Sequence, residues 1–345
     1  MTAAGAGPVT DVVAAHLRAE SDQPSVTSLI HGSLDAGEIA GQVAGVLSAV
    51  GLSAPVTGCL FHEASVGSVT GVVLSDGQRL VVKAYQPSWR PDFLRGVLAT
   101  QDRLYRAGVP CGRPIGGPVP CGRGSATIET FLADPGQPDV FGEAERSASA
   151  DGLAQVITNA GLDERLAAHP LLRRAGGLYP TPHSPLFDFE ATAAGAEWID
   201  DLARSAKAAD AGSRGRDEPA VSAHTDWSAR NVRLRAGGVR AVYDLDSLAA
   251  ISLSTAVGKA AVTWRALGEA GEPVAPGIDE IQAWIDRFPI ALSTVQRRAA
   301  IGAALSVLCY TARCEHAIDP EEHHHHRARP RLREDGDKFR RMLRG

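Results

Sequence analysis

The stretch HTDWSARNVRL, residues 224–234, holds three polar side chains whose spacing decides how the rest of the chain is interpreted. His224, Asp226 and Asn231 fit the pattern H-x-D-x(4)-N, and the sequence VYDLD, which follows a Gly-Gly turn, adds Asp244 and Asp246. At this chain's own residue frequencies, the first pattern arises by chance roughly once in a few hundred such sequences. The spacing therefore predicts a functional loop followed by a β-hairpin.

The hairpin is predicted from two β-like segments, residues 231–235 and 240–244. Two residues apart on a strand, Asp244 and Asp246 are expected on one face, where both could reach the same metal ion. Phosphoryl transfer to a hydroxyl needs a carboxylate that orients the nucleophile and takes its proton, and oxygen ligands for Mg²⁺. Asp226, Asn231 and the two later aspartates supply these groups. We expect His224 to hold the loop by hydrogen bonding to its backbone.

Simpler roles remain open for the same side chains. Asp226 would also suit a turn or a helix cap, and Asn231 a turn, since Asn favours turns. Asp246 would equally suit a position outside the metal's own ligands, or a helix cap.

Upstream, the sequence predicts an irregular start and then an amphipathic helix near residues 35–50, stopped by Gly51. Residues 71–74 and 79–85 are β-rich, and Asp76-Gly77 between them is a strong hairpin signal. The small residues at 64–71 can form a tight loop between two strands. Lys83 lies on the third strand of this unit and is the only lysine among the first 200 residues.

A helix is predicted over residues 91–107, followed by turns over the Pro- and Gly-rich residues 110–124 and a strand at 125–132. This small α/β lobe ends near residue 135. An exposed linker is predicted at 210–219, and a charged peripheral tail with a short helix from Asp319. The other helices are expected at residues 142–160, 190–209, 254–270, 277–287 and 293–317.

Composition excludes several classes of protein. The net charge of −5 gives no global basic field for nucleic acid or an anionic membrane. We find no secretory signal, and no apolar run reaches the roughly 18 residues of a membrane helix. The five cysteines form no CxxC pair, and their odd number argues against a disulfide framework. We therefore expect a cytoplasmic protein with reduced cysteines that acts on something small; its oligomeric state stays open.

HTDWSARN followed by VYDLD resembles the signature of the aminoglycoside phosphotransferase and choline kinase-like superfamily, relatives of the protein kinases. The resemblance implies an α+β, protein-kinase-like two-lobed fold, with a small antiparallel-sheet N-lobe and a mainly helical C-lobe. It covers roughly residues 40–315 and is specific at the catalytic loop and the metal strand. The expected division is an N-lobe at 1–135, a C-lobe at 136–318 and a tail at 319–345.

The resemblance also implies roles for particular residues. Asp226 would be the catalytic base, and Asn231 and Asp244 would hold Mg²⁺. Lys83 would contact the phosphates of ATP. The remaining nucleotide contacts would come from a phosphate-covering loop with Ser65, Gly67 and Ser68, and from a hinge whose backbone pairs with adenine, Glu129, Thr130 and Phe131.

This sequence departs from the family at the lysine. A Glu on the N-lobe helix usually pairs with it, but residues 91–107 contain no Glu. Gln101 and Asp102 are the nearest substitutes, and spacing does not choose between them. A catalytically silent, nucleotide-binding regulator of the same fold is therefore the alternative to an ATP-dependent small-molecule phosphotransferase.

Acidic and aromatic residues precede the catalytic loop, in the part of the chain where the family builds its acceptor site. They would suit a cationic hydroxyl compound such as an amino sugar, an amino alcohol or an antibiotic, whose phosphorylation would confer resistance. A solvated helix start is the competing interpretation. The residues are Phe187, Asp188, Phe189, Glu190, Glu197, Trp198, Asp200 and Asp201. The histidine run 323–326 would bind a transition metal only adventitiously.

Overall fold

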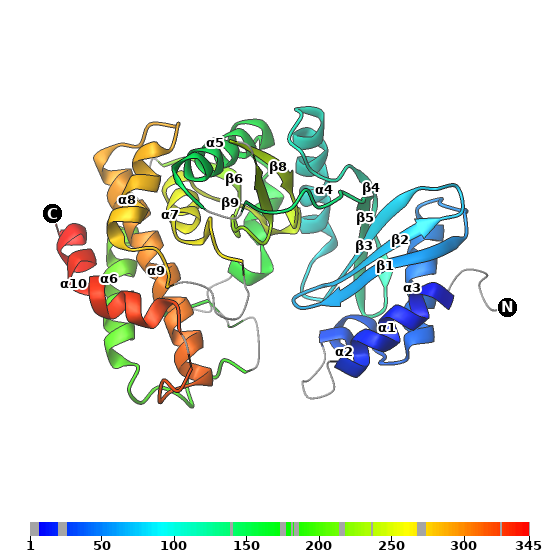
Figure 1. Cartoon of the computed structure of the whole chain (residues 1–345), viewed down its shortest axis with the longest axis horizontal. Coiled ribbons are helices and arrows are strands. Elements are labelled where there is room, and N and C mark those ends of the chain that lie inside the picture. The colour runs from blue at the N-terminus through cyan, green and yellow to red at the C-terminus, as the bar shows by residue number, and fades with distance from the viewer. Residues whose placement is uncertain are drawn as a thin grey trace. The chain divides into compact units, whose positions relative to one another are not determined.

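The computed structural model describes residues 7–19, 26–138, 141–172, 177–180, 182, 186–213, 218–235, 237–267, 274–324 and 326–344. The chain forms two compact units, Met1–Ala133 and Asp134–Gly345 (Figure 1). None of the helices in these ranges is long and apolar enough to cross a membrane.

The first unit is built on a five-stranded antiparallel sheet with the strand order β1-β2-β3-β5-β4. The predicted hairpin joins β2 to β3: Gly77 has a φ of 85°, and Asp76 Oδ1 accepts a hydrogen bond from the Gln78 amide at 3.0 Å. The strands are β1 (Val56–Ala64), β2 (Ser68–Leu74), β3 (Arg79–Tyr85), β4 (Pro114–Cys121) and β5 (Gly124–Thr130).

Helices cover both faces of this sheet, which is why β3 is buried along nearly its whole length. Leu80, Val82 and Ala84 join the apolar core that lies against α1 (Gly7–Ala19), α2 (Val26–His31) and α3 (Ala36–Ala49). Side chains of a strand alternate between faces. Lys83 therefore faces the other way, toward α4 (Pro91–Arg106), which hydrogen-bonds to β5 through Gln101 and Glu129.

Two predictions for this unit are wrong. Residues 110–124, predicted as turns, contain strand β4, because an edge strand tolerates the proline and glycine that a central strand would not. Its pairing with β5 shifts register around Gly116. The start of the chain, predicted as irregular, contains α1, whose Val9 and Val13 are buried in the core.

The second unit is mainly helical, with α9 packed against α6, α7, α8 and α10. A Cβ added at Gly258 of α7 would lie 2.1 Å from the Ala300 carbonyl oxygen of α9, so this close helix crossing requires glycine. The helices are α5 (Glu143–Ala160), α6 (Glu197–Ser213), α7 (Leu253–Thr263), α8 (Ile278–Arg287), α9 (Thr294–Ile318) and α10 (Ala328–Arg344), with 3-10 turns η1 (Glu164–Ala168), η2 (Pro170–Leu172) and η3 (Leu245–Ser247).

Two small antiparallel sheets complete this unit. The predicted hairpin is present as β7 (Val232–Arg235) paired with β8 (Gly238–Val242). A second pair, β6 (Ala220–His224) with β9 (Leu248–Ser252), was not predicted. The predicted α+β class, with an antiparallel N-terminal sheet and a mainly helical second part, is confirmed. Of the predicted linker, 214–217 lie outside the described residues, and α6 extends to Ser213.

The charged segment after Asp319 is not a peripheral tail. It forms the 17-residue helix α10, which buries Leu332, Phe339 and Leu343. Glu315 of α9 accepts hydrogen bonds from the first amides of this helix, those of Arg327, Ala328 and Arg329, at 2.8–2.9 Å. Asp335 of α10 in turn accepts from the Ile278 amide at the start of α8. These two carboxylates cap helices other than their own, which explains why so charged a segment is integral to the unit.

We predict that Glu315→Ala lowers the free energy of unfolding by about 2 kcal/mol, because three amides at a helix start lose a charged acceptor. Chemical denaturation measures the change. Glu321→Ala is the matched control, since the Glu321 side chain is 80% exposed and should change stability little. An unchanged stability in Glu315→Ala would show that apolar packing alone holds α10.

Candidate functional site

His224 fixes the start of the candidate catalytic loop. It ends strand β6, is 1% exposed, and pairs with Leu248 of β9. Its Nε2 donates to the Tyr243 carbonyl oxygen at 3.0 Å, and its Nδ1 accepts from the Asp226 amide at 3.3 Å. Both bonds form together only when the ring carries its proton on Nε2. The ring therefore holds the loop by backbone hydrogen bonds, as predicted.

Asn231 turns its amide group toward Asp226. Its Nδ2 donates to Asp226 Oδ2 at 2.8 Å and to the Asp226 carbonyl oxygen at 3.1 Å. The backbone turns between Asp226 and Asn231, where the Ser228 carbonyl oxygen accepts hydrogen bonds from the amides of Asn231 and Val232. With Nδ2 used in this way, the remaining polar atom of the Asn231 side chain is Oδ1. Asp226 and Asn231 thus act as one hydrogen-bonded pair.

The β7–β8 hairpin brings Asp244 next to Asn231. The Tyr243 amide donates to the Asn231 carbonyl oxygen at 2.8 Å, one step beyond the pairing of Val232 with Val242. Asp244 then has a φ of 55° and a ψ of 46°, a left-handed conformation that non-glycine residues rarely adopt. Ser247 holds it there by donating its amide to the Asp244 carbonyl oxygen at 2.9 Å and its hydroxyl to Asp244 Oδ2 at 2.8 Å.

The expectation that Asp244 and Asp246 share one face of a strand is wrong. β8 ends at Val242, Asp244 turns the chain sharply, and Asp246 belongs to the 3-10 turn η3. Strand alternation therefore does not apply to this pair. Asp246 instead lies close enough to the buried His169 for its charge to oppose the effect of burial, which lowers the pKa of His169 to about 4.

Trp227 attaches the loop to helix α5. Its Nε1 donates to both the backbone oxygen and the hydroxyl of Ser149 at 3.1 Å, and the ring is 1% exposed. Gly152, one turn further along α5, makes room for it: an added Cβ would lie 3.1 Å from the indole and 2.3 Å from Val239. Sequence reasoning missed these contacts, because nothing in the spacing of residues 142–160 marks them.

Residues 134–137, at the start of the second unit, form hydrogen bonds and an ion pair with the β7–β8 hairpin and the loop before it. Arg233 forms a two-point ion pair with Asp134, at 2.8 and 2.9 Å, which holds the pKa of that carboxyl below its usual range. Gln137 donates to the carbonyl oxygens of Ala229 and Val232. The candidate catalytic loop is therefore held by hydrogen bonds to its backbone from several parts of the second unit.

In the first unit, Lys83 is 7% exposed, and its Nζ lies 3.5 Å from Glu129 Oε1. Gln101 Nε2 donates to Glu129 Oε2 at 2.5 Å, whereas Asp102 pairs with Arg106 near the surface. Of the two substitutes considered for the missing helix Glu, Gln101 is therefore the one at the lysine site. It reaches the lysine through Glu129, which was predicted to act through its backbone.

The predicted phosphate-covering loop is shorter than expected. Ser68 already belongs to β2, is buried, and its hydroxyl lies 3.0 Å from His31 Nε2. Only residues 65–67 remain outside the strands, with the Ser65 amide donating to the Gly67 carbonyl oxygen at 2.9 Å. Gly67 lies close to β3: an added Cβ would be 3.2 Å from the Ala84 carbonyl oxygen.

Two of the predicted hinge amides are already engaged. The Thr130 amide donates to the Arg113 carbonyl oxygen and the Phe131 amide to the Arg79 carbonyl oxygen, both at 2.9 Å. Arg79 also stacks its guanidinium 4.1 Å from the centre of the Phe131 ring. These two amides therefore bond to neighbouring backbone carbonyl oxygens in this structure.

Two carboxylates of the acidic segment before the candidate catalytic loop, Asp200 and Asp201, are paired with arginines of the protein itself. Arg313 of α9, 1% exposed, lies 3.3 Å from Asp200 and 4.8 Å from the centre of the Phe189 ring, and Tyr179 donates to Asp200 at 2.8 Å. Asp188 caps a turn, and Asp201 pairs with Arg204. Three of the five carboxylates expected to bind a cationic acceptor, those of Asp188, Asp200 and Asp201, therefore already have partners within the protein. Residues 181 and 183–185 of this segment lie outside the described residues.

The histidine run folds around one carboxylate. Asp319 accepts from the amides of His323 and His324 and from His326 Nε2 at 2.8–3.0 Å; His325 lies outside the described residues. In the parts of the chain that the structure describes, no three His, Cys, Asp or Glu side chains form a metal-binding group. All five cysteines are free thiols, as expected, and four of them are buried.

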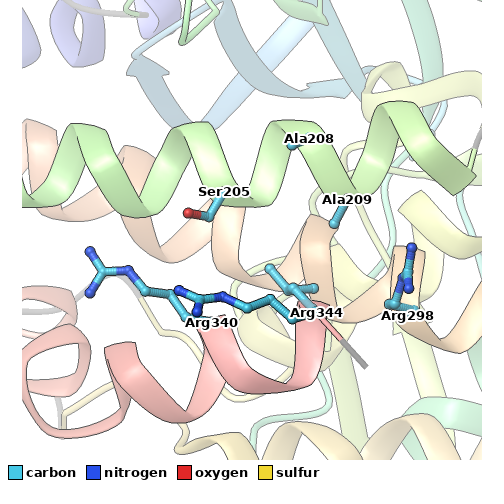
Figure 2. Close-up of a pocket in the computed structure, with 7 residues that line it drawn as sticks. Ser205, Ala208, Ala209, Arg298, Arg340 and Arg344 are labelled. Atoms are coloured by element: carbon cyan, nitrogen blue, oxygen red, sulfur yellow. The ribbon is translucent and has the colours of Figure 1, made fainter.

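A hollow of ≈ 270 Å³ lies between α6, α9 and α10, where Ser205 faces Arg340 and Arg344 (Figure 2). Arg298 of α9 lines its other end. None of the predicted site residues contributes to it, so this hollow is not part of the candidate catalytic site.

No protein-family model and no curated protein sequence matches the chain. Solved structures that it resembles are small-molecule kinases. A spectinomycin phosphotransferase in complex with ADP and spectinomycin is 11% identical, with a TM-score of 0.49 over 88% of this chain and 93% of that one. An aminoglycoside phosphotransferase from Alicyclobacillus acidocaldarius is 14% identical, with a TM-score of 0.46 over 87% and 94%.

An ethanolamine kinase from Plasmodium vivax is 10% identical, with a TM-score of 0.47 over 81% of this chain and 79% of that one. At these identities the likeness concerns the fold alone.

We predict that His224→Phe lowers the free energy of unfolding by about 2 kcal/mol or more, because the Asp226 amide and the Tyr243 carbonyl both lose a buried partner. Chemical denaturation measures this loss. Imidazole ¹⁵N spectra of the unaltered protein should show the signal that disappears in the variant to be protonated at Nε2. His324→Phe is the control, since its ring is 82% exposed. Equal stability of the two variants would contradict the anchoring role.

Proposed function

We propose that the protein is an ATP-dependent phosphotransferase that moves the γ-phosphoryl group to a hydroxyl of a small molecule. The observation that carries this proposal is the arrangement of Asp226, Asn231 and Asp244: the Asn231 side-chain nitrogen donates to the Asp226 carboxylate, and the Asn231 backbone oxygen accepts from the amide of Tyr243, the residue before Asp244. Phosphoryl transfer needs positioning and charge stabilisation more than covalent chemistry from the protein, and this fixed loop suits both needs.

Asp226 is the group that we assign to the acceptor. Its carboxylate would orient the hydroxyl and take its proton while the oxygen bonds to the γ-phosphorus and the bond from phosphorus to the β,γ-bridging oxygen breaks. Asn231 supports this role, because its Nδ2 fixes one carboxylate oxygen and leaves the other to face the acceptor. Lys83 of the first unit would bind the phosphates of ATP.

The residues present fit Mg²⁺. Asn231 Oδ1 and the Asp244 carboxylate are hard oxygen donors, and the backbone bond from the Tyr243 amide to the Asn231 carbonyl oxygen ties the two residues to the same end of the hairpin. Mg²⁺ is typically bound by one or two carboxylates together with substrate phosphates and water, so a larger protein cluster is not required. When bound, the ion would supply positive charge to the phosphate oxygens. Asp246 is not needed for this set.

The test is incubation with ATP or GTP, Mg²⁺ and a panel of amino sugars, amino alcohols, sugars and cationic antibiotics, followed by assay of ADP and mass spectrometry of the acceptor. We expect acceptor-dependent turnover that falls about 100-fold or more in Asp226→Asn, since the general base is lost without a change of shape. Asp244→Asn should weaken the dependence on Mg²⁺ concentration and lower the rate.

Asp286→Asn is the matched control, because Asp286 lies on α8, outside the candidate site, and its exposed carboxylate pairs with Arg297. Turnover that survives Asp226→Asn would overturn the assignment of the base. Nucleotide binding without turnover on any acceptor would favour the alternative, a silent nucleotide-binding regulator.

A further inference from the structure

The lysine site of the first unit is built differently from the helix-acid arrangement that the resemblance implies. Lys83 on β3 and Glu129 on β5 lie on neighbouring strands, where Lys83 pairs with Thr127 and Val81 with Glu129. Residues two apart on a strand share a face, so the two side chains are diagonal neighbours across the ladder. Their charged atoms lie 3.5 Å apart, with side-chain exposures of 9% and 16%.

Helix α4 contributes a neutral amide in place of an acid. Gln101 is 2% exposed, and its Nε2 donates both to Glu129 Oε2 at 2.5 Å and to the Gly112 carbonyl oxygen at 2.8 Å. A side-chain amide has two N–H donors, and both are used. Gln101 therefore fixes one carboxylate oxygen of Glu129, while the other oxygen faces Lys83.

We propose that Glu129 is the carboxylate that positions Lys83 for nucleotide phosphates, and that Gln101 positions Glu129. This inference rests on the proposed function for its nucleotide. An ammonium group with so little exposure needs a nearby negative charge, because removing it from water without one is costly. Glu129 supplies that charge, with its Oε1 3.5 Å from the Lys83 Nζ and its other oxygen held by Gln101.

This arrangement has a consequence for the helix. In the helix-acid arrangement, displacing the helix removes the counter-charge of the lysine. Here both charged partners belong to adjacent hydrogen-bonded strands, so the ion pair is part of the sheet. A movement of α4 would break the neutral hydrogen bond from Gln101 to Glu129, whereas the Lys83–Glu129 pair joins two strands of the sheet. The lysine is therefore set in place by the fold of the first unit itself.

The test compares phosphate-dependent with phosphate-independent binding in the full-length protein. Dissociation constants for a non-hydrolysable ATP analogue and for adenosine are measured by calorimetry with the unaltered protein, Glu129→Gln, Gln101→Met and Asp102→Asn. Glu129→Gln keeps the shape and the backbone of the site. We expect it to weaken the ATP analogue about tenfold and to leave adenosine unchanged. Gln101→Met should produce a smaller loss of the same kind.

Asp102→Asn is the matched control: it removes one carboxylate from the adjacent helix position, and its partner is Arg106. It should bind both ligands as the unaltered protein does. If Glu129→Gln weakens the ATP analogue and adenosine equally, Glu129 merely supports the fold and the positioning role is wrong. If Glu129→Gln binds as the unaltered protein does, the proposal is overturned as well.

A spectroscopic measurement separates this proposal from the proposed function. The chain has only four lysines, so isotope-labelled lysine gives few side-chain signals, and Lys83→Arg assigns the relevant one. Glu129→Gln should shift the Lys83 Cε signal, and Asp102→Asn should not. If the unaltered protein binds no nucleotide, the proposed function fails, while a shifted signal still supports the Lys83–Glu129 pair. An unshifted signal overturns the pair.

Discussion

The hydrogen bond from Asn231 Nδ2 to Asp226 Oδ2 is the contact on which the candidate catalytic loop depends. Only four residues separate the two side chains, so the backbone must turn back on itself, which it does through the carbonyl oxygen of Ser228. The same asparagine accepts from the Tyr243 amide and so ties the loop to the hairpin that presents Asp244. Asn231 thus orients the Asp226 carboxylate and ties the loop to the hairpin, and Asp could not replace it as the side-chain donor.

Some turns and hairpins of the fold could be predicted from the sequence, because they depend on residues at short spacings. The loop, the β7–β8 hairpin and the Asp76-Gly77 turn each involve residues close along the chain. Strands β6 and β9 could not be found in this way, since each is short and gains stability only by pairing with the other across the intervening loop. Strand β4 was hidden by its prolines and glycines, which an edge position tolerates.

Individual side chains were harder to predict than elements. Asp244 looked like a strand residue because the left-handed conformation of a non-glycine residue leaves no mark in the sequence. Glu129 and Lys83 face one another only once the register of β3 and β5 is known. Asp200, one of the acidic residues before the candidate catalytic loop, pairs with Arg313 of α9, which spacing did not indicate. For Lys83 and Asp200 the deciding partner lies far along the chain, where spacing carries no information.

Both units keep arrangements that stability alone does not favour. A buried ion pair such as Lys83–Glu129 is often no more stabilising than apolar residues of similar size. A non-glycine residue in a left-handed conformation, such as Asp244, costs on the order of 1–3 kcal/mol. A protein that only had to fold could do so without either cost. A silent regulator would need the lysine site and the proposed Mg²⁺ ligand Asp244 to bind a nucleotide, but it would have no use for a carboxylate oriented as Asp226 is by Asn231. The fixed Asp226 carboxylate is therefore the physical reason to favour catalysis over binding alone.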